Sequence, residues 1–372
     1  MTGARRSLVW VAVLVAAALA GLLAWENGTR AQAPTAQPRS ANDTAAAATA
    51  PDRMIWDSDS FNPGDDAYPA VAYNSQDDEY LVVFEWENVG GGSGRDLASI
   101  IVDSNGQAAI SPSGVATSNT YTDTRPAVAY NPTNNTYLAV WERSPGGNGA
   151  KDIWGAILHP SGSVSGTAFF IVNWSGNQQY PDVAYSTVVS RYLVVWEDHA
   201  LSWLNGPNIH SASLNDQGAD KDDYSVSGDV TGGQFQPAVA ANNANGRWIV
   251  TWSDSRDIGS TGHDIYVQQI ALSGGGAPYA WGVQVHIGDF WGVANAPDVA
   301  WGQFGSGDGE FLTVWSENSI IYGQRVQVNS ALAGDVFTVS TSLAGSQSFP
   351  AVAFDSADEA WWVVWADNRD YG

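Results

Sequence analysis

Short apolar runs separated by polar turns recur along the chain from residue 53 onward. Each unit opens with a small apolar run such as "PAVAY" at Pro69, followed by a β-branched and aromatic run such as "YLVVW" at Tyr192. Asn-, Ser- and Gly-rich turns join them, and a third run ("DIWGAIL" at Asp152) and a fourth ("FFIV" at Phe169) follow. Such runs favour strands, and no segment has helical spacing. The pattern predicts four short antiparallel strands per unit.

The unit repeats six times. Its opening proline recurs at intervals of 53 to 60 residues, at Pro69, Pro126, Pro181, Pro237, Pro297 and Pro350. An aromatic residue ends the second run of each copy: Phe84, Trp141, Trp196, Trp252, Trp315 and Trp365. A string of separate β domains would leave the apolar faces of such small sheets uncovered, so neighbouring units must cover them. The sequence therefore predicts an all-β fold, a β-propeller of four-stranded antiparallel blades, over residues 53–372.

The two ends of the repeat array differ from its middle. Met54–Trp56 stands where a fourth strand stands in other copies and is predicted to be a closing strand that covers a sheet edge. In the last copy "ADNRDYG" matches "SDSRDIG" at Ser253, the loop before a third strand. The last blade is therefore expected to be incomplete and the sequence to be a fragment; further repeats would give more than six blades.

The layout resembles the TolB-type and other WD40-like propellers. There too a Pro-containing strand opens the unit, and a third strand like "DIY" at Asp264 leads to a Gly turn. The resemblance implies a propeller over residues 53–372. The "SPDG" turn of the TolB repeat is absent, so the family's functional residues cannot be carried over.

The N-terminus has the features of an export signal. Arg5 and Arg6 precede the uncharged, mostly apolar run Ser7–Trp25, which predicts a signal peptide or signal anchor over residues 1–25. Residues 26–52 are rich in Ala, Thr and Pro and are predicted to form a disordered linker. The protein is expected to be secreted or anchored at the extracytoplasmic face, without membrane insertion beyond this anchor.

The net charge of the chain limits the classes of molecule that it can bind. The formal net charge is −24, and the chain has only two lysines and no cysteine. An acidic surface repels phosphate backbones, so nucleic-acid binding is not expected. Without disulfides, stability must come from packing.

The tryptophan that ends the second run has two interpretations, a sugar-stacking platform or packing between blades, and its repetition favours packing. Trp203 and Trp291 lie outside the repeat, in loop classes that open on one face of a propeller. They are the candidate stacking residues.

Acids after the second run fall on the same face, and the ligand-binding candidates among them are Glu142, Glu197, Asp198, Asp254 and Glu317. The alternative is that such acids bind local backbone N–H groups.

The densest acidic stretch is "DSDSFNPGDD", whose carboxylates at Asp57, Asp59, Asp65 and Asp66 would suit calcium as a cofactor. It fails the EF-hand pattern, because Phe61 and Tyr68 occupy ligand positions.

No catalytic motif is identified. A catalytic carboxylate pair should break the repeat symmetry, and no acid stands out in this way; a Ser-x-Asp-x-Gly-x-x-Trp box and a Gly-x-Ser-x-Gly elbow are absent. The leading hypothesis is an exported, non-catalytic binding or scaffold propeller that recognises a glycan or an extracellular protein. The alternative is a carbohydrate-active enzyme, a glycoside hydrolase or lyase, that uses carboxylates of the loop face.

Overall fold

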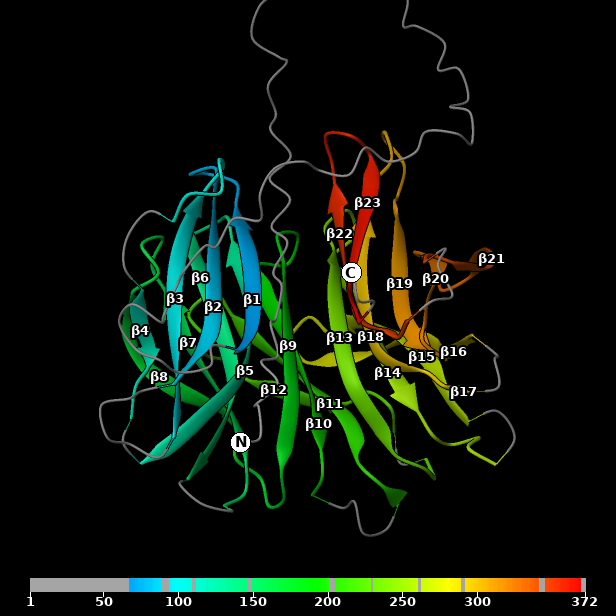
Figure 1. Cartoon of the computed structure of the whole chain (residues 1–372), viewed down its shortest axis with the longest axis horizontal. Coiled ribbons are helices and arrows are strands. Elements are labelled where there is room, and N and C mark those ends of the chain that lie inside the picture. Colours follow the sequence, from blue (N-terminus) through cyan, green and yellow to red (C-terminus); the bar gives the residue numbers. More distant parts are fainter. Residues whose placement is uncertain are drawn as a thin grey trace, which may run out of the picture.

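The chain is a β-propeller whose described strands run from β1 to β23 (Figure 1). The computed structural model describes residues 67–87, 94–108, 112–118, 120–145, 149–200, 205–228, 230–259, 262–288, 292–340 and 345–368. The predicted signal, linker and closing strand lie outside these residues. Within the described part, no helix is long and apolar enough to cross a membrane.

Each copy of the repeat forms one sheet of antiparallel strands in chain order, and the fourth sheet carries one short extra strand that pairs in parallel with its third strand. The first three sheets comprise β1 (Ala67–Asn74), β2 (Glu79–Glu87), β3 (Arg95–Asp103) and β4 (Ser113–Ala116); β5 (Tyr121–Asn131), β6 (Thr136–Pro145), β7 (Asp152–Leu158) and β8 (Val164–Val172); and β9 (Gln178–Ser186), β10 (Arg191–Asp198), β11 (Asn208–Asn215) and β12 (Asp222–Ser225). The remaining sheets comprise β13 (Gln234–Asn242), β14 (Arg247–Asp254), β15 (Gly262–Leu272), β16 (Pro278–Ile287) and the short β17 (Gly292–Val293); β18 (Asn295–Gly302), β19 (Glu310–Glu317), β20 (Ile320–Gln327) and β21 (Leu332–Thr338); and β22 (Gln347–Asp355) with β23 (Ala360–Asp367). The predicted four-stranded unit is confirmed, and the sixth sheet has two strands among the described residues.

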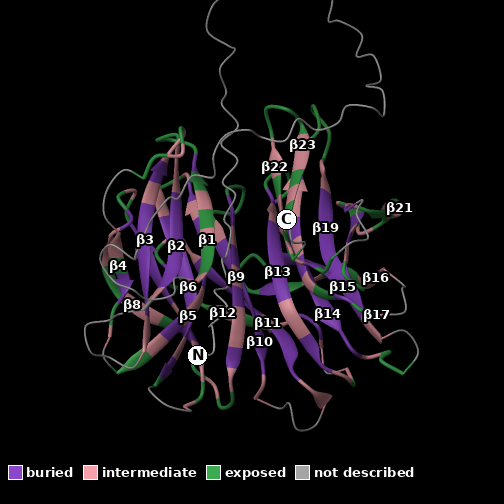
Figure 2. Ribbon diagram, in the orientation of Figure 1, coloured by how far each residue is buried: buried purple, intermediate pink, exposed green. Residues whose placement is uncertain are grey.

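The first strands of the sheets form the inner part of the fold. Each of them is an edge strand of its sheet, and each packs against the first strand of the next sheet, from β1 through β5, β9, β13 and β18 to β22. The apolar core consequently lies between sheets. Leu138 and Val140 of the second sheet, for example, belong to one buried cluster with Val194 and Trp196 of the third. Figure 2 shows second and third strands such as β2, β3 and β19 largely buried, whereas the first strands β1 and β22 are mostly intermediate or exposed.

The tryptophans that end the second strands pack between sheets, as the repeat predicted. Trp141, Trp196, Trp252 and Trp315 are all fully buried. They therefore do not form sugar-stacking platforms.

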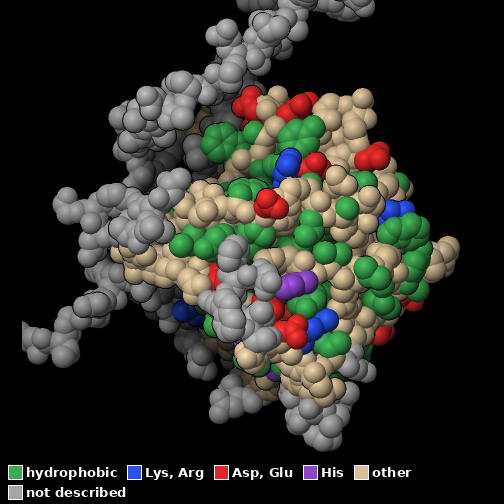
Figure 3. Space-filling model, turned by 90° about the vertical axis from the view of Figure 1, so that its right-hand side faces the viewer, with side chains coloured by type: hydrophobic (Ala, Val, Ile, Leu, Met, Phe, Trp, Pro, Cys, Tyr) green, Lys and Arg blue, Asp and Glu red, His purple; other side chains and the backbone are tan. Residues whose placement is uncertain are grey.

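The outer strands are more exposed than the inner ones. On β16 and β21, Trp281, Val283 and Phe337 are exposed, and Figure 3 shows hydrophobic side chains scattered among uncharged ones on this side of the molecule.

Every inner strand contains a bulge at the residue before its proline. These residues have φ between 47° and 52°, which is uncommon for a residue other than glycine: Tyr68, Arg125, Tyr180, Gln236, Ala296 and Phe349. Strand register shifts at the same point in all six sheets. Bulges turn backbone groups out of the ladder, and here they turn a backbone N–H toward the preceding sheet.

Candidate functional site

Glutamates near the ends of the second strands accept hydrogen bonds from backbone N–H groups at the bulges of the next sheet. Glu85 Oε1 accepts the backbone N–H of Arg125 at 2.8 Å, and Glu142 Oε1 accepts that of Tyr180 at 2.8 Å. Glu197 Oε2 accepts the N–H of Gln236 at 3.1 Å. All three carboxylates are buried. They join successive sheets through groups that would otherwise be buried without a partner.

The second oxygen of each of these carboxylates meets a basic side chain. Lys151 Nζ lies 2.5 Å from Glu142 Oε2, and His199 Nε2 lies 2.6 Å from Glu197 Oε1. Both oxygens of Glu142 and Glu197, two of the predicted ligand-binding residues, are thus engaged by protein groups.

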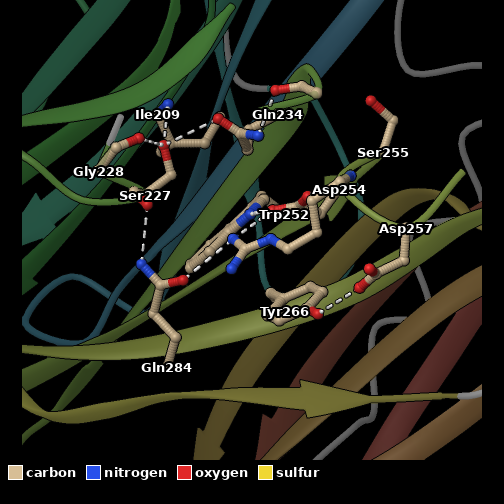
Figure 4. Close-up of polar contacts among 12 residues, drawn as sticks. Ile209, Ser227, Gly228, Gln234, Trp252, Asp254, Ser255, Asp257, Tyr266 and Gln284 are labelled. Atoms are coloured by element: carbon tan, nitrogen blue, oxygen red, sulfur yellow. Dashed lines mark hydrogen bonds and ion pairs between the residues drawn. The ribbon is translucent and has the colours of Figure 1, made fainter. Parts of the chain in front are cut away.

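Asp254 of the fourth sheet forms an ion pair that positions the side chain of Arg256 (Figure 4). Its Oδ2 accepts from Trp252 Nε1 at 2.8 Å and from Arg256 Nη2 at 2.6 Å. The Arg256 guanidinium lies 4.0 Å from the ring centroid of Tyr266 and also donates to Gln284 Oε1 at 3.0 Å. Figure 4 shows Asp254, Trp252, Tyr266 and Gln284 converging on one place.

Glu317 of the fifth sheet is buried against a tryptophan. Its Oε2 accepts from Trp315 Nε1 at 3.3 Å. Burial raises the pKa of Glu317, and the Trp315 bond partly offsets this.

Asp198 differs from these acids because it lines a pocket. The pocket has a volume of about 460 Å³ and lies at the end of the third sheet, lined by Trp174, Asp198, Ala200, Asn208, His210, Ser225 and Gly228. Asp198 Oδ1 accepts from Gln178 Nε2 at 2.9 Å. The structure thus separates the five predicted acids: four are held by protein contacts, and Asp198 borders an open space.

The remaining predicted residues lie outside the described part of the chain. These are Trp203, Trp291, Asp57, Asp59, Asp65 and Asp66. Trp203 belongs to residues 201–204, which connect two pocket-lining residues, Ala200 and Asn208. Among the described residues, no group of three or more His, Cys, Asp or Glu side chains is placed to hold a metal ion.

Two further carboxylates were missed in the sequence. Asp182 on β9 and Asp298 on β18 follow the repeat proline, where the other four copies have alanine. Both are half-buried on inner strands. The signal was visible as "PDVA" against "PAVA", and these are the acids that break the repeat symmetry.

The surroundings of Asp182 and Asp298 raise the pKa values of both acids. Burial, and then the charge of Asp298, raises the pKa of Asp182 to about 7. Burial raises the pKa of Asp298 to about 6. Each carboxylate also accepts one backbone N–H from the next sheet, that of Val239 for Asp182 and that of Val352 for Asp298, both at 2.7 Å. Two half-buried acids with raised pKa values, neither of which forms an ion pair with a described residue, mark a candidate functional site.

Comparisons with known proteins agree with the fold. No protein-family model and no curated protein matches the sequence. A protein of unknown function from Dyadobacter fermentans is similar in structure, with a TM-score of 0.59, 12% identity, and coverage of 82% of this chain and 92% of that chain. The α-L-arabinanase of Penicillium chrysogenum complexed with arabinobiose gives a TM-score of 0.53 at 11% identity, covering 81% and 93%.

A mutant of the α-L-arabinofuranosidase of Fusarium graminearum, in complex with an iminosugar inhibitor, gives a TM-score of 0.52 at 12% identity, covering 78% of this chain and 85% of that chain. At these identities the likeness concerns the fold alone. It supports a propeller of the kind found in these glycosidases, whereas the expected TolB-type or WD40-like variety is not supported.

Proposed function

We propose that the protein is a carbohydrate-active enzyme, a glycoside hydrolase that uses Asp182 and Asp298. The observation that carries the proposal is the placement of these two acids, unique among the six copies, on inner strands with raised pKa values. Glycoside hydrolysis needs one protonated and one ionised carboxyl group at the scissile bond.

The two pKa values assign the roles. Asp182, at about 7, keeps its proton longer and would be the general acid that protonates the leaving oxygen. Asp298, at about 6, ionises first and would act as base or nucleophile at the anomeric carbon. Because the reaction needs Asp298 ionised and Asp182 protonated, the rate should peak in a narrow range between about pH 6 and about pH 7.

The similar structures support the substrate class. The names of the arabinanase and the arabinofuranosidase indicate action on arabinose-containing glycans, and a shared fold makes such glycans the first substrates to test. A fold alone does not specify a reaction, so the proposal rests on the acids. With the predicted export signal, we place this activity outside the cytoplasm.

A second candidate function is non-catalytic recognition of a glycan or an extracellular protein. It is favoured by the bonds from Asp182 to Val239 and from Asp298 to Val352, because a carboxylate that joins two sheets can have a structural role alone.

Incubation with arabinan, galactan and a sialylated oligosaccharide separates the two functions, with newly formed reducing ends as the measurement. Hydrolysis predicts chain shortening that falls by about 10²–10⁴-fold in Asp182→Asn and in Asp298→Asn. The exposed Asp335 provides the control variant Asp335→Asn, which should keep full activity. Retention of a glycan without shortening would leave only the non-catalytic function. Shortening unaffected by both variants would show that Asp182 and Asp298 are not the catalytic pair.

A further inference from the structure

We propose that the pocket of the third sheet binds a cationic group of a ligand, an ammonium or a guanidinium. This site is independent of the acids at Asp182 and Asp298, and it goes beyond the proposed hydrolase. The argument comes from the fourth sheet, where the chain's own arginine occupies the corresponding position.

The third and fourth sheets correspond residue by residue here. Ala200 follows Asp198 by two positions, as Arg256 follows Asp254. In both cases the backbone N–H of the later residue donates to the aspartate Oδ1, at 3.3 Å for Ala200 and 2.9 Å for Arg256. The backbone around the two aspartates is therefore arranged alike, with alanine at the position where the fourth sheet has arginine.

The arginine of the fourth sheet shows what this position can hold. Arg256 pairs with Asp254 Oδ2 at 2.6 Å and stacks over Tyr266 at 4.0 Å. A methyl group stands at Ala200 instead, and Ala200 lines the pocket. The stretch from Asp198 to His210 contains no lysine or arginine, and its His199 is already paired with Glu197.

The third sheet retains the groups that would surround a cation. His210 takes the place of Tyr266, since it pairs with Trp196 as Tyr266 pairs with Trp252. Trp174 adds a second ring at 5.2 Å from His210, inclined by 83°. Aromatic faces attract cations, and more so where water is excluded.

Asp198 and its neighbours supply acceptors. Asp198 is 7% exposed, and its Oδ2 lies 3.9 Å from His210 Nε2, beyond hydrogen-bond length. Asn208, also 7% exposed, has an Oδ1 atom that finds no partner among the described residues, and neither does Ser225 Oγ. A buried carboxylate and an unpaired amide oxygen suit a donor that carries positive charge, and they repel an anion.

The pocket volume of about 460 Å³ accepts a small organic cation. Two sources share the required chemistry: an amino sugar and an arginine side chain. Each has a neutral counterpart of nearly the same shape, glucose for glucosamine and citrulline for arginine.

The test is a calorimetric titration of the full chain with each of these four compounds. We expect glucosamine or arginine to bind about ten-fold or more tightly than its neutral counterpart, and the arm that responds identifies the source. Asp198→Asn should remove that preference. Equal affinity for charged and neutral partners, or binding in neither arm, would overturn the proposal.

A second variant locates the site. Ala200→Arg restores the residue found in the fourth sheet and should fill the pocket, abolishing binding while the melting temperature stays unchanged or rises. Ala244→Arg adds the same charge at an exposed turn and should bind like the unmodified chain. Binding that survives Ala200→Arg would contradict the assignment.

Discussion

Asp182 Oδ2 accepts the backbone N–H of Val239 at 2.7 Å, so a side chain of β9 binds the inner strand of the next sheet. The same contact, also at 2.7 Å, joins Asp298 of β18 to Val352 of β22. In a propeller the first strand of each sheet has one unpaired edge, and these carboxylates satisfy part of it.

Asp182 should make stability depend on pH in a defined direction. Its pKa rises from 3.8 to about 7 in the folded protein, so between these values the folded chain holds a proton that the unfolded chain has released. The free energy of unfolding must therefore fall as pH rises through this window, by at most about 1.4 kcal/mol per pH unit from this group. Above about pH 7 both states are ionised and the effect is constant.

The measurement is urea unfolding between about pH 3 and about pH 8, a range that spans both values of the pKa. Asp182→Asn should flatten the fall, since the amide keeps an acceptor for Val239 but does not titrate. Asp335→Asn, at an exposed position, should follow the unmodified chain. A steep fall that persists unchanged in Asp182→Asn would assign it to other groups.

Glu142 should be the most costly of the acids after the second strands to remove. Glu142→Ala leaves the N–H of Tyr180 and the ammonium of Lys151 without their partner, which should lower the free energy of unfolding by about 2–3 kcal/mol. Glu142→Gln keeps one acceptor for Tyr180 and should cost about half as much.

Glu310 provides the matched control for Glu142. Its pair with Arg325, at 3.4 Å, involves side chains that are 26% and 45% exposed. Glu310→Ala should cost under about 1 kcal/mol, because exposed ion pairs contribute little. Chemical denaturation of the three variants checks the order, and equal losses at Glu142 and Glu310 would show that burial does not matter here.

The sequence predicted the fold because the fold repeats. A proline that opens the first run and an aromatic residue that ends the second run of every copy are local signals, and the six copies reinforce one another. The bulge itself was not predicted, because φ near +50° at residues as different as Tyr68 and Ala296 follows from sheet packing. Neither residue type indicates it.

The site was harder to predict for the opposite reason. Asp182 and Asp298 are single departures from a repeat, and alignment of the copies emphasises what they share. The pocket was harder still, because it arises from a small side chain: Ala200 stands where Arg256 stands one sheet later. A small side chain in place of a large one leaves no recognisable motif in the sequence. It becomes visible only when the two sheets are compared in space.

The sixth sheet gives the last prediction, because one of its faces is uncovered. Trp362 and Val364 are 46% and 42% exposed, whereas Leu312 and Val314, at the same positions of the fifth sheet, are 3% and 0% exposed. A contiguous apolar face of this kind favours association between molecules. Because Leu312 is a packed core side chain, Leu312→Ser should lower the free energy of unfolding by about 2–5 kcal/mol.

Trp362→Ser should instead leave the melting temperature nearly unchanged and reduce self-association. Sedimentation velocity over a range of protein concentrations measures the second effect, and thermal unfolding measures the first. The two variants introduce the same residue at the same repeat position, so they compare an exposed apolar side chain with a buried one. Loss of stability in Trp362→Ser equal to that in Leu312→Ser would mean that this face is covered in solution.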